Sequence, residues 1–273
     1  MSPDEPYEMH PEVAHASRMY DYLLGGTNNF EADRRAVEKA AAAVGGIEFA
    51  QADARANRDF LRRSIQVLAE AGVRQFLDIG CGIPNGVDDA HTVAFEQAPD
   101  ARVVSVDNNA IVLASSHCLL RAPKDGAAGF VFGDLRDSDQ VLGEAALTLD
   151  LTKPVGLLLV ALLHHVPDAQ EPARLVARLL DALAPGSYLA VTHLSNDLAP
   201  DGLLDTLDTE SRDPFFARSA VELGPFMDGL DLLDPGLVPV NEWRPEPGKD
   251  TALPAGWRPS FYGAVAAKPE PRS

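Results

Sequence analysis

Short apolar runs rich in β-branched residues alternate with helix-compatible segments through the middle of this chain. The runs are residues 75–79, 102–106, 129–132, 155–163 and 187–192. Parallel strands need a crossover connection between them, and a helix supplies it, so this alternation predicts a parallel sheet covered by helices on both faces. We therefore predict an α/β fold for the central part of the chain.

Two segments carry the strongest local signals. The run VGLLLVALL, residues 155–163, is apolar almost throughout and is typical of a central strand. Residues 171–183 are predicted to be a helix, because Pro172 stands in the first turn and Pro185 with Gly186 ends the pattern. The apolar stripe of that helix is Leu175, Val176, Leu179, Leu180 and Leu183.

Three helical segments are predicted before the first strand. Residues 1–15 are polar and are expected to be loose. A first helix from Ala16 ends at a Gly-Gly pair, a second covers residues 31–44, and Asp53 is expected to cap a third that runs to Ala71. We predict residues 1–72 as an N-terminal helical cap or lid, and residues 73–273 as a ligand-binding α/β domain.

The C-terminal part is less regular. Residues 195–229 are predicted to be an insertion, and their aromatic residues at 211–227 suit either a roof over a pocket or a satellite core under a long loop. Two strand-like runs follow. The first is around 230–233 or 237–240, and the second is 261–267.

The amino-acid composition restricts the classes of partner that this protein can bind. The chain has 273 residues, 46% of them hydrophobic, with 41 acids against 23 Lys and Arg and a formal charge of −18. A phosphate backbone needs a basic surface, so nucleic-acid binding is disfavoured and small ligands or protein partners are favoured. There is no run long enough for a membrane span and no secretory signal pattern, which predicts a cytoplasmic protein. Cys81 and Cys118 are interpreted as reduced thiols, and no metal site is predicted.

The stretch FLDIGCGIPNG, residues 76–86, follows the first predicted strand. Gly80 and Gly82 allow a sharp turn and let a ligand approach the main chain, at the sheet edge where open α/β folds bind ligands. A single G-x-G also suits a plain tight turn. The dinucleotide fingerprint needs a third glycine, but Asn85 stands there after Pro84, which weakens a pyrophosphate site.

Acidic residues stand at the ends of three successive strands. Asp78 stands beside the glycine turn, Asp107 ends the run RVVSVD, and Asp134 follows FVFG. A carboxylate in these places can pair with an ammonium group, accept hydrogen bonds from ribose hydroxyls, or receive an adenine amine. A ligand with an ammonium, a ribose and an adenine but no phosphate fits this set, and S-adenosylmethionine has those parts.

These motifs resemble class I S-adenosylmethionine-dependent methyltransferases: DIGCG is similar to their first motif, VDNN to the second and GDLRD to the third. RMYDYLLGGTNNFEADR, GIPN, APDARVVSVDNN and ALLHHVPD are similar to an actinobacterial group of "S-adenosyl methyltransferase" proteins formerly of unknown function. The resemblance covers most of the chain. It implies a Rossmann-like, seven-stranded, mostly parallel sheet with an antiparallel last strand.

The resemblance also implies residue roles. Asp78, Gly80 and Gly82 would line the methionine end of the cofactor, Asp107 would hold the ribose, and Asp134 with Leu135 would bracket the adenine. Further expected cofactor contacts are Cys81, Asn108, Ala161, Tyr22 and Gly26. The family has a glycine near the position of Pro84, so the loop path after Gly82 is expected to differ.

Catalytic candidates lie past the fourth strand and in the cap. His164 and His165 could act as base or orient the acceptor, or could be structural, and His193 is a similar case. Tyr22 is a further candidate, because a tyrosine face attracts a sulfonium.

The segment YDYLLGGTNNF, residues 20–30, could form a lid that includes Tyr20, Asp21 and Tyr22. Alternatively, it packs as a plain helix–turn–helix in which Asn28 or Asn29 caps the second helix. A structural role is predicted for His91.

The sequence therefore predicts an S-adenosylmethionine-dependent methyltransferase that acts on a small-molecule acceptor. The first alternative is a catalytically silent S-adenosylmethionine-binding module, a sensor or scaffold, which would have its cap and insertion packed shut over the cofactor. An NAD-dependent oxidoreductase is disfavoured by Asn85 and by the lack of a Tyr-x-x-x-Lys pair.

Overall fold

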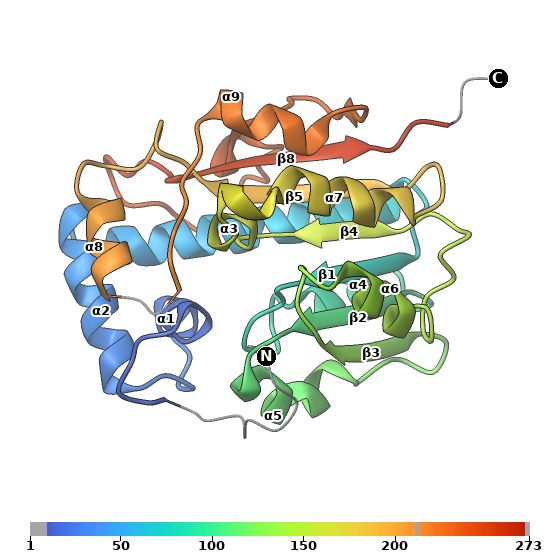
Figure 1. The fold of residues 1–273 in the computed structure, drawn as a ribbon, viewed down its shortest axis with the longest axis horizontal. Helices are drawn as coiled ribbons and strands as arrows, with labels where there is room; N and C mark the ends of the chain where they lie inside the picture. Colours follow the sequence, from blue (N-terminus) through green and yellow to red (C-terminus); the bar gives the residue numbers. More distant parts are fainter. Residues whose placement is uncertain (1–9, 211–212, 271–273) are drawn as a thin grey trace.

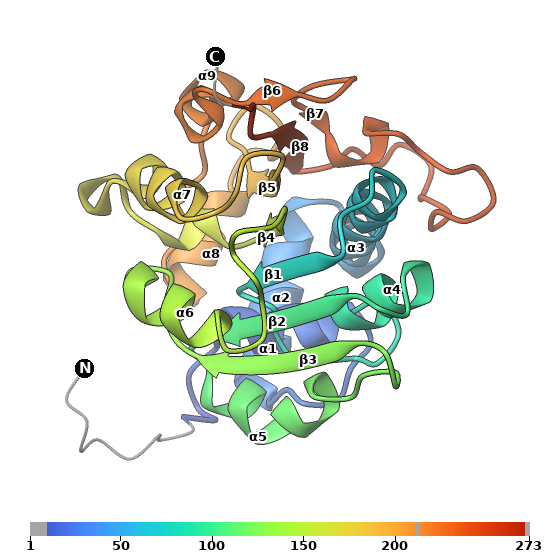
Figure 2. The ribbon, with the colours of Figure 1, turned by 90° about the vertical axis from the view of Figure 1, so that its right-hand side faces the viewer.

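The computed structural model describes residues 10–210 and 213–270. Within this part, one mixed eight-stranded sheet has the order β3-β2-β1-β4-β5-β8-β6, with β7 also paired to β8 (Figure 2). The first five strands of this order are parallel, and β8 is antiparallel to β5. The strands are β1 (Gln75–Ile79), β2 (Arg102–Asp107), β3 (Ala127–Phe132), β4 (Gly156–Leu159), β5 (Tyr188–Leu194), β6 (Asp231–Leu232), β7 (Val238–Pro239) and β8 (Phe261–Ala267).

Helices cover both faces of the sheet, as the strand–helix alternation predicts. Figure 2 shows α3 and α4 on one face and α6 and α7 on the other. The helices are α1 (Ala16–Leu23), α2 (Glu31–Ala43), α3 (Ile47–Glu70), α4 (Ala90–Gln97), α5 (Ala110–Leu119), α6 (Ser138–Ala145), α7 (Pro172–Asp181), α8 (Leu203–Glu210) and α9 (Ala220–Leu223). Short 3-10 helices are η1 (Leu163–His165), η2 (Asp168–Gln170), η3 (Gly224–Met227) and η4 (Val240–Glu242).

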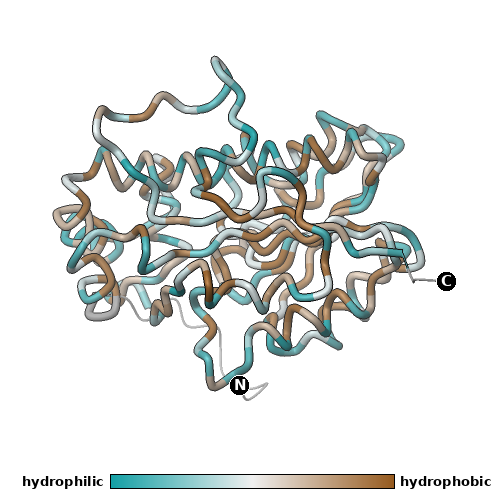
Figure 3. The backbone as a smooth tube through the Cα atoms, turned by 90° about the horizontal axis from the view of Figure 1, so that it is seen from above, coloured by the Kyte–Doolittle hydropathy of each residue, from teal (hydrophilic) through white to brown (hydrophobic). Residues whose placement is uncertain are grey.

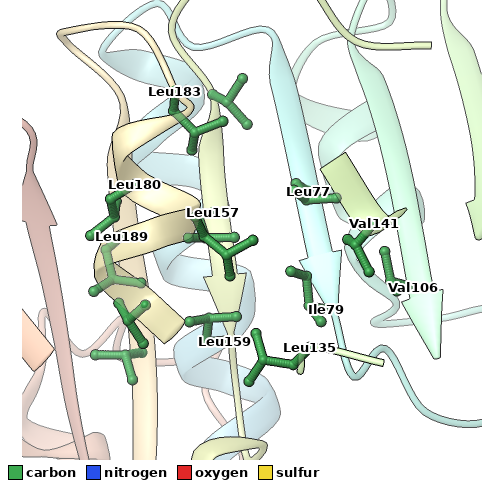
Figure 4. Close-up of a cluster of buried hydrophobic side chains, with 14 of the residues drawn as sticks. Leu77, Ile79, Val106, Leu135, Val141, Leu157, Leu159, Leu180, Leu183 and Leu189 are labelled. Atoms are coloured by element: carbon green, nitrogen blue, oxygen red, sulfur yellow. The ribbon is translucent and has the colours of Figure 1, made fainter. Parts of the chain in front are cut away.

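Successive side chains of a strand point to opposite faces, so each strand contributes to two cores. On β1, Leu77 and Ile79 belong to the cluster under α6 and α7 (Figure 4), whereas Phe76 packs with Phe60 of α3. Burying each such side chain contributes about 1.5–3 kcal/mol. The hydrophobic segments accordingly run through the middle of the molecule, with hydrophilic stretches towards the outer loops (Figure 3). Asp78 shares the face of Phe76 and so looks towards α3.

The antiparallel edge differs from the predicted seven strands. Both stretches that we considered for the penultimate strand form short strands, and both pair with β8. Asp231 and Leu232 pair with Ala267 and Ala266, and β7 pairs further along at Gly263 and Tyr262. The predicted penultimate strand is thus divided into β6 and β7 by an intervening loop.

Two element boundaries are wrong in the sequence prediction. The run 155–163 leaves the sheet at Leu159, because Ala161 takes a positive φ of 54° and η1 follows. A buried 3-10 turn is as apolar as a strand, so composition cannot separate them. The third helix begins at Ile47 after an N-cap at Gly46, so Asp53 lies inside α3 and does not cap it.

The helices α1, α2 and α8 lie together beyond the end of the sheet at which β4 points (Figure 1). Helix α2 packs against α1 and α8. A buried ion pair fixes α1 to α2, since Arg18 Nε lies 2.9 Å from Asp33 Oδ2. Of the N-terminal segment predicted to be loose, residues 1–9 lie outside the described residues, while His15 caps α1.

Among the described residues, no helix combines the length and the apolar character that crossing a membrane requires.

Candidate functional site

The turn after β1 depends on its glycines. Gly80 and Gly82 have φ of 77° and 70°, a region that strains other residues. A Cβ on Gly80 would also lie only 2.8 Å from Leu162 Cδ1. This close approach of two chain segments fixes the position of the bare backbone at the carboxyl end of β1.

The chain after Gly82 does not enter a helix directly, and α4 begins only at Ala90. Asp89 holds this loop, because its carboxylate accepts from the backbone N–H groups of Asn85 at 3.1 Å and Gly86 at 2.6 Å. A carboxylate therefore stands at the place where a dinucleotide fold presents a helix N-terminus to pyrophosphate. The geometry argues against the oxidoreductase alternative.

A cavity of about 280 Å³ opens at this edge of the sheet, between the strand ends and the cap helices. Asp78, Asp107 and Asp134 all line it, as the sequence hypothesis requires. So do nearly all of the other predicted contacts, namely Gly80, Cys81, Gly82, Asn108, Leu135, Ala161, Gly26, His164 and His165. The residues that the sequence assigned to one ligand share one cavity.

Tyr22 is the exception, because it is not among the residues that line the cavity. Its hydroxyl donates to Glu38 Oε1 at 3.3 Å, it packs against the cluster around Met19, and it does not line the cavity. Residues two apart on a helix point about 200° apart. Tyr20 lines the cavity instead, with its hydroxyl donating to Ala54 O at 3.0 Å.

The Gly-Gly turn after α1 is held by Asp21. A Cβ on Gly26 would lie 2.1 Å from Asp21 Oδ1, so a glycine is required there. Asn29 Nδ2 donates to Asp21 Oδ2 at 2.8 Å and to Gly26 O at 3.0 Å. Asn29 therefore braces the turn and does not cap α2, whose N-cap residue is Phe30.

Asp107 and Asp134 are already hydrogen-bonded to backbone around the cavity. Asp107 accepts from the N–H groups of Gly82 and Asn109, both at 2.9 Å. Burial raises the pKa of Asp107 to about 6, although these hydrogen bonds oppose the rise. Asp134 accepts from Asn108 Nδ2 at 2.8 Å, which links the ends of β2 and β3.

Asp78 faces an arginine that sequence reasoning missed. Burial raises the pKa of Asp78 to about 7, against the attraction of Arg58, and the charges of Asp89 and Asp107 raise it further. The Arg58 side chain comes from α3, lies over the ring of Tyr20 at 5.4 Å, and lines the cavity. Arg58 is only 8% exposed, and its buried Nε has no hydrogen-bond partner among the described residues.

The two histidines of η1 also face the cavity. His164 is buried and stacks on Phe215 at 5.7 Å between ring centroids, and burial holds its pKa well below the usual range. His165 Nδ1 lies 3.2 Å from Pro214 O, so it donates there. The pKa of His165 is also lowered by burial. Its neutral ring then carries the basic lone pair on Nε2.

His193 is structural. It does not line the cavity; Arg218 Nη1 donates to its Nε2 at 2.9 Å, and its Nδ1 donates to Leu194 O at 2.7 Å. Burial lowers the pKa of His193 to about 4. Arg218 also donates to Leu163 O and Val166 O, and so fixes η1 beneath the cavity. His91 is likewise buried in α4 away from the cavity, against Phe95.

The cap and the insertion both contribute to the cavity wall. Leu203, Leu207 and Phe215 of the insertion line it, whereas Phe226 and Met227 belong to the core under α7. The aromatic stretch is therefore part roof and part core.

The whole chain resembles known proteins. Residues 3–269 match the family model described as "S-adenosyl methyltransferase". A DUF574 family protein from Streptomyces avermitilis MA-4680 is 38% identical, with a TM-score of 0.88, and the match covers 95% of this chain and 99% of that one. A methyltransferase candidate from Thermobifida fusca YX is 31% identical, with a TM-score of 0.84, over 98% of this chain and 100% of that one. No protein with a curated description matches the sequence.

Proposed function

The chain belongs to the S-adenosyl methyltransferase family and is an S-adenosylmethionine-dependent methyltransferase, and we propose that its acceptor is a small molecule bound in the same cavity as the cofactor. The observation that carries this proposal is the extent of the cavity. It runs from the strand ends that match the cofactor motifs to the helices α1, α2 and α8. One continuous space can therefore hold both reactants side by side.

The order of the strands suggests how the cofactor lies. Asp134 follows β3, Asp107 ends β2 and Asp78 is on β1, and these three strands are neighbours in this order. We infer that the adenine lies at Asp134 and Leu135, the ribose at Asp107 with Asn108, and the methionine end at Asp78. When bound, S-adenosylmethionine supplies a methyl group on a positively charged sulfur.

Arg58 completes this assignment. A guanidinium offers five N–H donors, and leaving them buried without an acceptor is costly. The methionine end of the cofactor carries a carboxylate, which can pair with a guanidinium through two parallel hydrogen bonds. Asp78 beside it suits the ammonium group. Arg58 and Asp78 together then match a zwitterion, and the carboxylate of the ligand offers the buried guanidinium a hydrogen-bond acceptor.

His165 is the candidate base for methyl transfer. Its Nδ1 is engaged by Pro214 O, which leaves Nε2 free to accept a proton at the cavity. A lowered pKa keeps this imidazole neutral at pH 7, so it can act as a base. His164, locked between Phe215 and Phe261, is assigned a positioning role.

Calorimetric titration with S-adenosylhomocysteine, and with NAD as control, tests the cofactor assignment. Heat with NAD and none with S-adenosylhomocysteine would overturn it. Methylthioadenosine, which lacks the amino-acid part, then isolates Arg58. We expect Arg58→Met to weaken S-adenosylhomocysteine binding on the order of 100-fold and to leave methylthioadenosine binding unchanged, because removing one partner of a buried ion pair costs about 2–5 kcal/mol.

Arg55→Met is the matched control, since Arg55 is exposed on the same helix and does not line the cavity. It should bind both nucleosides like the unchanged protein. Equal weakening of both nucleosides by Arg58→Met would contradict the carboxylate assignment.

A further inference from the structure

The sheet divides the cavity into two halves. The three cofactor acids occupy the β3–β2–β1 side. On the other side, His164 and His165 follow β4, Leu194 ends β5, and Phe261 begins β8, and all four line the same cavity. Leu194 and Phe261 are paired across β5 and β8. If the proposed function holds, the β4–β5–β8 side is left for the acceptor, and we call it the acceptor half.

Apolar side chains from the cap close the cavity. Met19 and Leu23 belong to α1, Val37 to α2 and Leu207 to α8, and all of them line the cavity and pack in one cluster. Figure 1 shows these three helices side by side beyond the strand ends. An apolar wall contributes affinity in proportion to the hydrocarbon that it covers, at about 25 cal/mol per Å². This wall therefore suits a ligand with a hydrocarbon body.

Two polar groups of α3 interrupt this apolar wall. Asp53 lines the cavity next to β8, with Oδ1 accepting from Ser260 N at 2.9 Å. Asn57 lies one helical turn further on, so both point the same way. Asn57 Nδ2 donates to the Tyr20 hydroxyl at 2.8 Å, while its fully buried Oδ1 has no partner among the described residues. The lining thus includes a carboxylate and a buried residue with an orphan acceptor, which match a ligand that donates hydrogen bonds.

The charge of the side chains that line the cavity also favours a ligand that donates hydrogen bonds. The acids of this lining are Asp21, Asp53, Asp78, Asp107, Asp134 and Asp213, and its only Lys or Arg residues in the described chain are Arg58 and Arg136. Arg136 pairs with Asp134, and Arg58 faces the methionine end. Among the described residues, the lining of the acceptor half includes no arginine or lysine of its own. Carboxylates and phosphates would be repelled there, and a hydroxyl or thiol would be hard to ionise.

We propose that the acceptor is an apolar amine, held by Asp53 and Asn57 with its hydrocarbon part against the cap, and that the enzyme is an N-methyltransferase. Burial raises the pKa of Asp53 to about 6, so its carboxylate is ionised above neutral pH and attracts an ammonium group. The N–H groups of the same nitrogen satisfy Asn57 Oδ1. Neither a carboxylic acid nor an ether oxygen can do both.

The reaction balances with groups that line the same cavity. The bound ammonium gives one proton to His165 Nε2 and becomes the free amine. Its nitrogen lone pair forms the new bond to the methyl carbon, the carbon–sulfur bond breaks, and that electron pair stays on sulfur. The sulfonium becomes a neutral thioether, and the positive charge passes to the methylated nitrogen.

Three probes with the same apolar body and different polar ends test the proposal: phenethylamine, phenethyl alcohol and phenylacetate. Binding is measured by calorimetry on protein saturated with S-adenosylhomocysteine, so that a failure of the cofactor assignment is seen first and separately. We expect phenethylamine to bind at least 10-fold more tightly than the alcohol, and phenylacetate to bind most weakly. Phenylacetate or the alcohol binding as tightly as the amine overturns the proposal, as does an amine that fails to bind at millimolar concentration.

The variant Asp53→Asn tests whether the Asp53 carboxylate binds the ammonium group. Asparagine keeps an acceptor for Ser260 N, so the fold is retained while the charge is lost. Phenethylamine binding should fall about 10-fold or more, and binding of the alcohol and of S-adenosylhomocysteine should not change. Glu48→Gln removes an exposed acid of the same helix and should change none of the three affinities. Unchanged amine binding by Asp53→Asn contradicts the proposal.

Discussion

Replacing Asp78 by asparagine should stabilise the free protein while weakening cofactor binding. The folded pKa of Asp78 is about 7, against an ordinary value of 3.8. The protein therefore pays for ionising this group. The stability that the neutral acid provides is complete below pH 4 and is lost as pH rises towards 7. A difference of about 3 pKa units corresponds to about 4 kcal/mol at about 1.4 kcal/mol per unit.

Urea unfolding at pH 5 and pH 8 measures this effect. Asparagine resembles the neutral acid at every pH, so we expect Asp78→Asn to unfold with a free energy up to about 4 kcal/mol higher at pH 8 and about 1.5 kcal/mol higher at pH 5. Asp181→Asn, a change at an exposed acid, should show neither increase. A variant that is less stable than the unchanged protein at pH 8 would refute the reasoning, because the ionised Asp78 would then stabilise the fold through Arg58.

Saturating S-adenosylhomocysteine should stabilise the unchanged protein more than the Asp78→Asn variant. The ligand's ammonium group compensates the ionised Asp78, but it finds only a neutral amide in the variant. At pH 8 the midpoint of thermal unfolding should therefore rise more on ligand addition for the unchanged protein than for Asp78→Asn. Equal increases would mean that Asp78 does not contact the amino group.

Three further predictions address single features of the cavity. S-adenosylhomocysteine affinity should rise between pH 5 and pH 7, because ribose hydroxyls donate to the ionised form of Asp107, whose pKa is raised to about 6; calorimetry that shows a flat profile contradicts this. Gly80→Ala should cost about 1–2 kcal/mol of unfolding free energy from its positive φ alone and should lower ligand affinity, whereas Gly143→Ala, in open space on α6, should do neither. Tyr20→Phe should cost about 1–3 kcal/mol by urea unfolding, since it removes the acceptor of a buried amide, and Tyr22→Phe, at the exposed hydrogen bond, should be nearly neutral.

The three acids of the cavity could be predicted because of sheet geometry. The carboxyl ends of parallel strands fall on one edge, so Asp78, Asp107 and Asp134 meet there whatever the exact strand lengths are. For this reason, the assignment of these three acids does not depend on the element boundaries that were predicted wrongly. A residue placed by a strand end needs only the strand to be recognised.

Arg58 and Tyr20 could not be predicted in the same way. Arg58 stands in the polar-looking stretch ANRDFLRR, where an arginine is expected on a solvated face, and only the packing of α3 against the glycine loop buries it. The choice between Tyr20 and Tyr22 depends on the rotation of a helix of eight residues. That rotation is set by contacts with α2 and α3, which are distant in sequence.

The buried residues that oppose folding of the free protein also indicate the chemistry of the ligand. A buried acid with a pKa near 7, another with a pKa near 6 and a buried guanidinium with an orphan Nε all oppose folding of the empty protein. Apolar residues of similar volume in place of Asp78 and Arg58 would be expected to stabilise the free protein, whereas Asp107 also accepts from the backbone N–H groups of Gly82 and Asn109. These costs are offset only when a ligand brings an ammonium, hydroxyl donors and a carboxylate at the matching strand ends, which are the groups of S-adenosylmethionine. The groups whose burial is unfavourable in the free protein therefore match the groups of the cofactor that it binds.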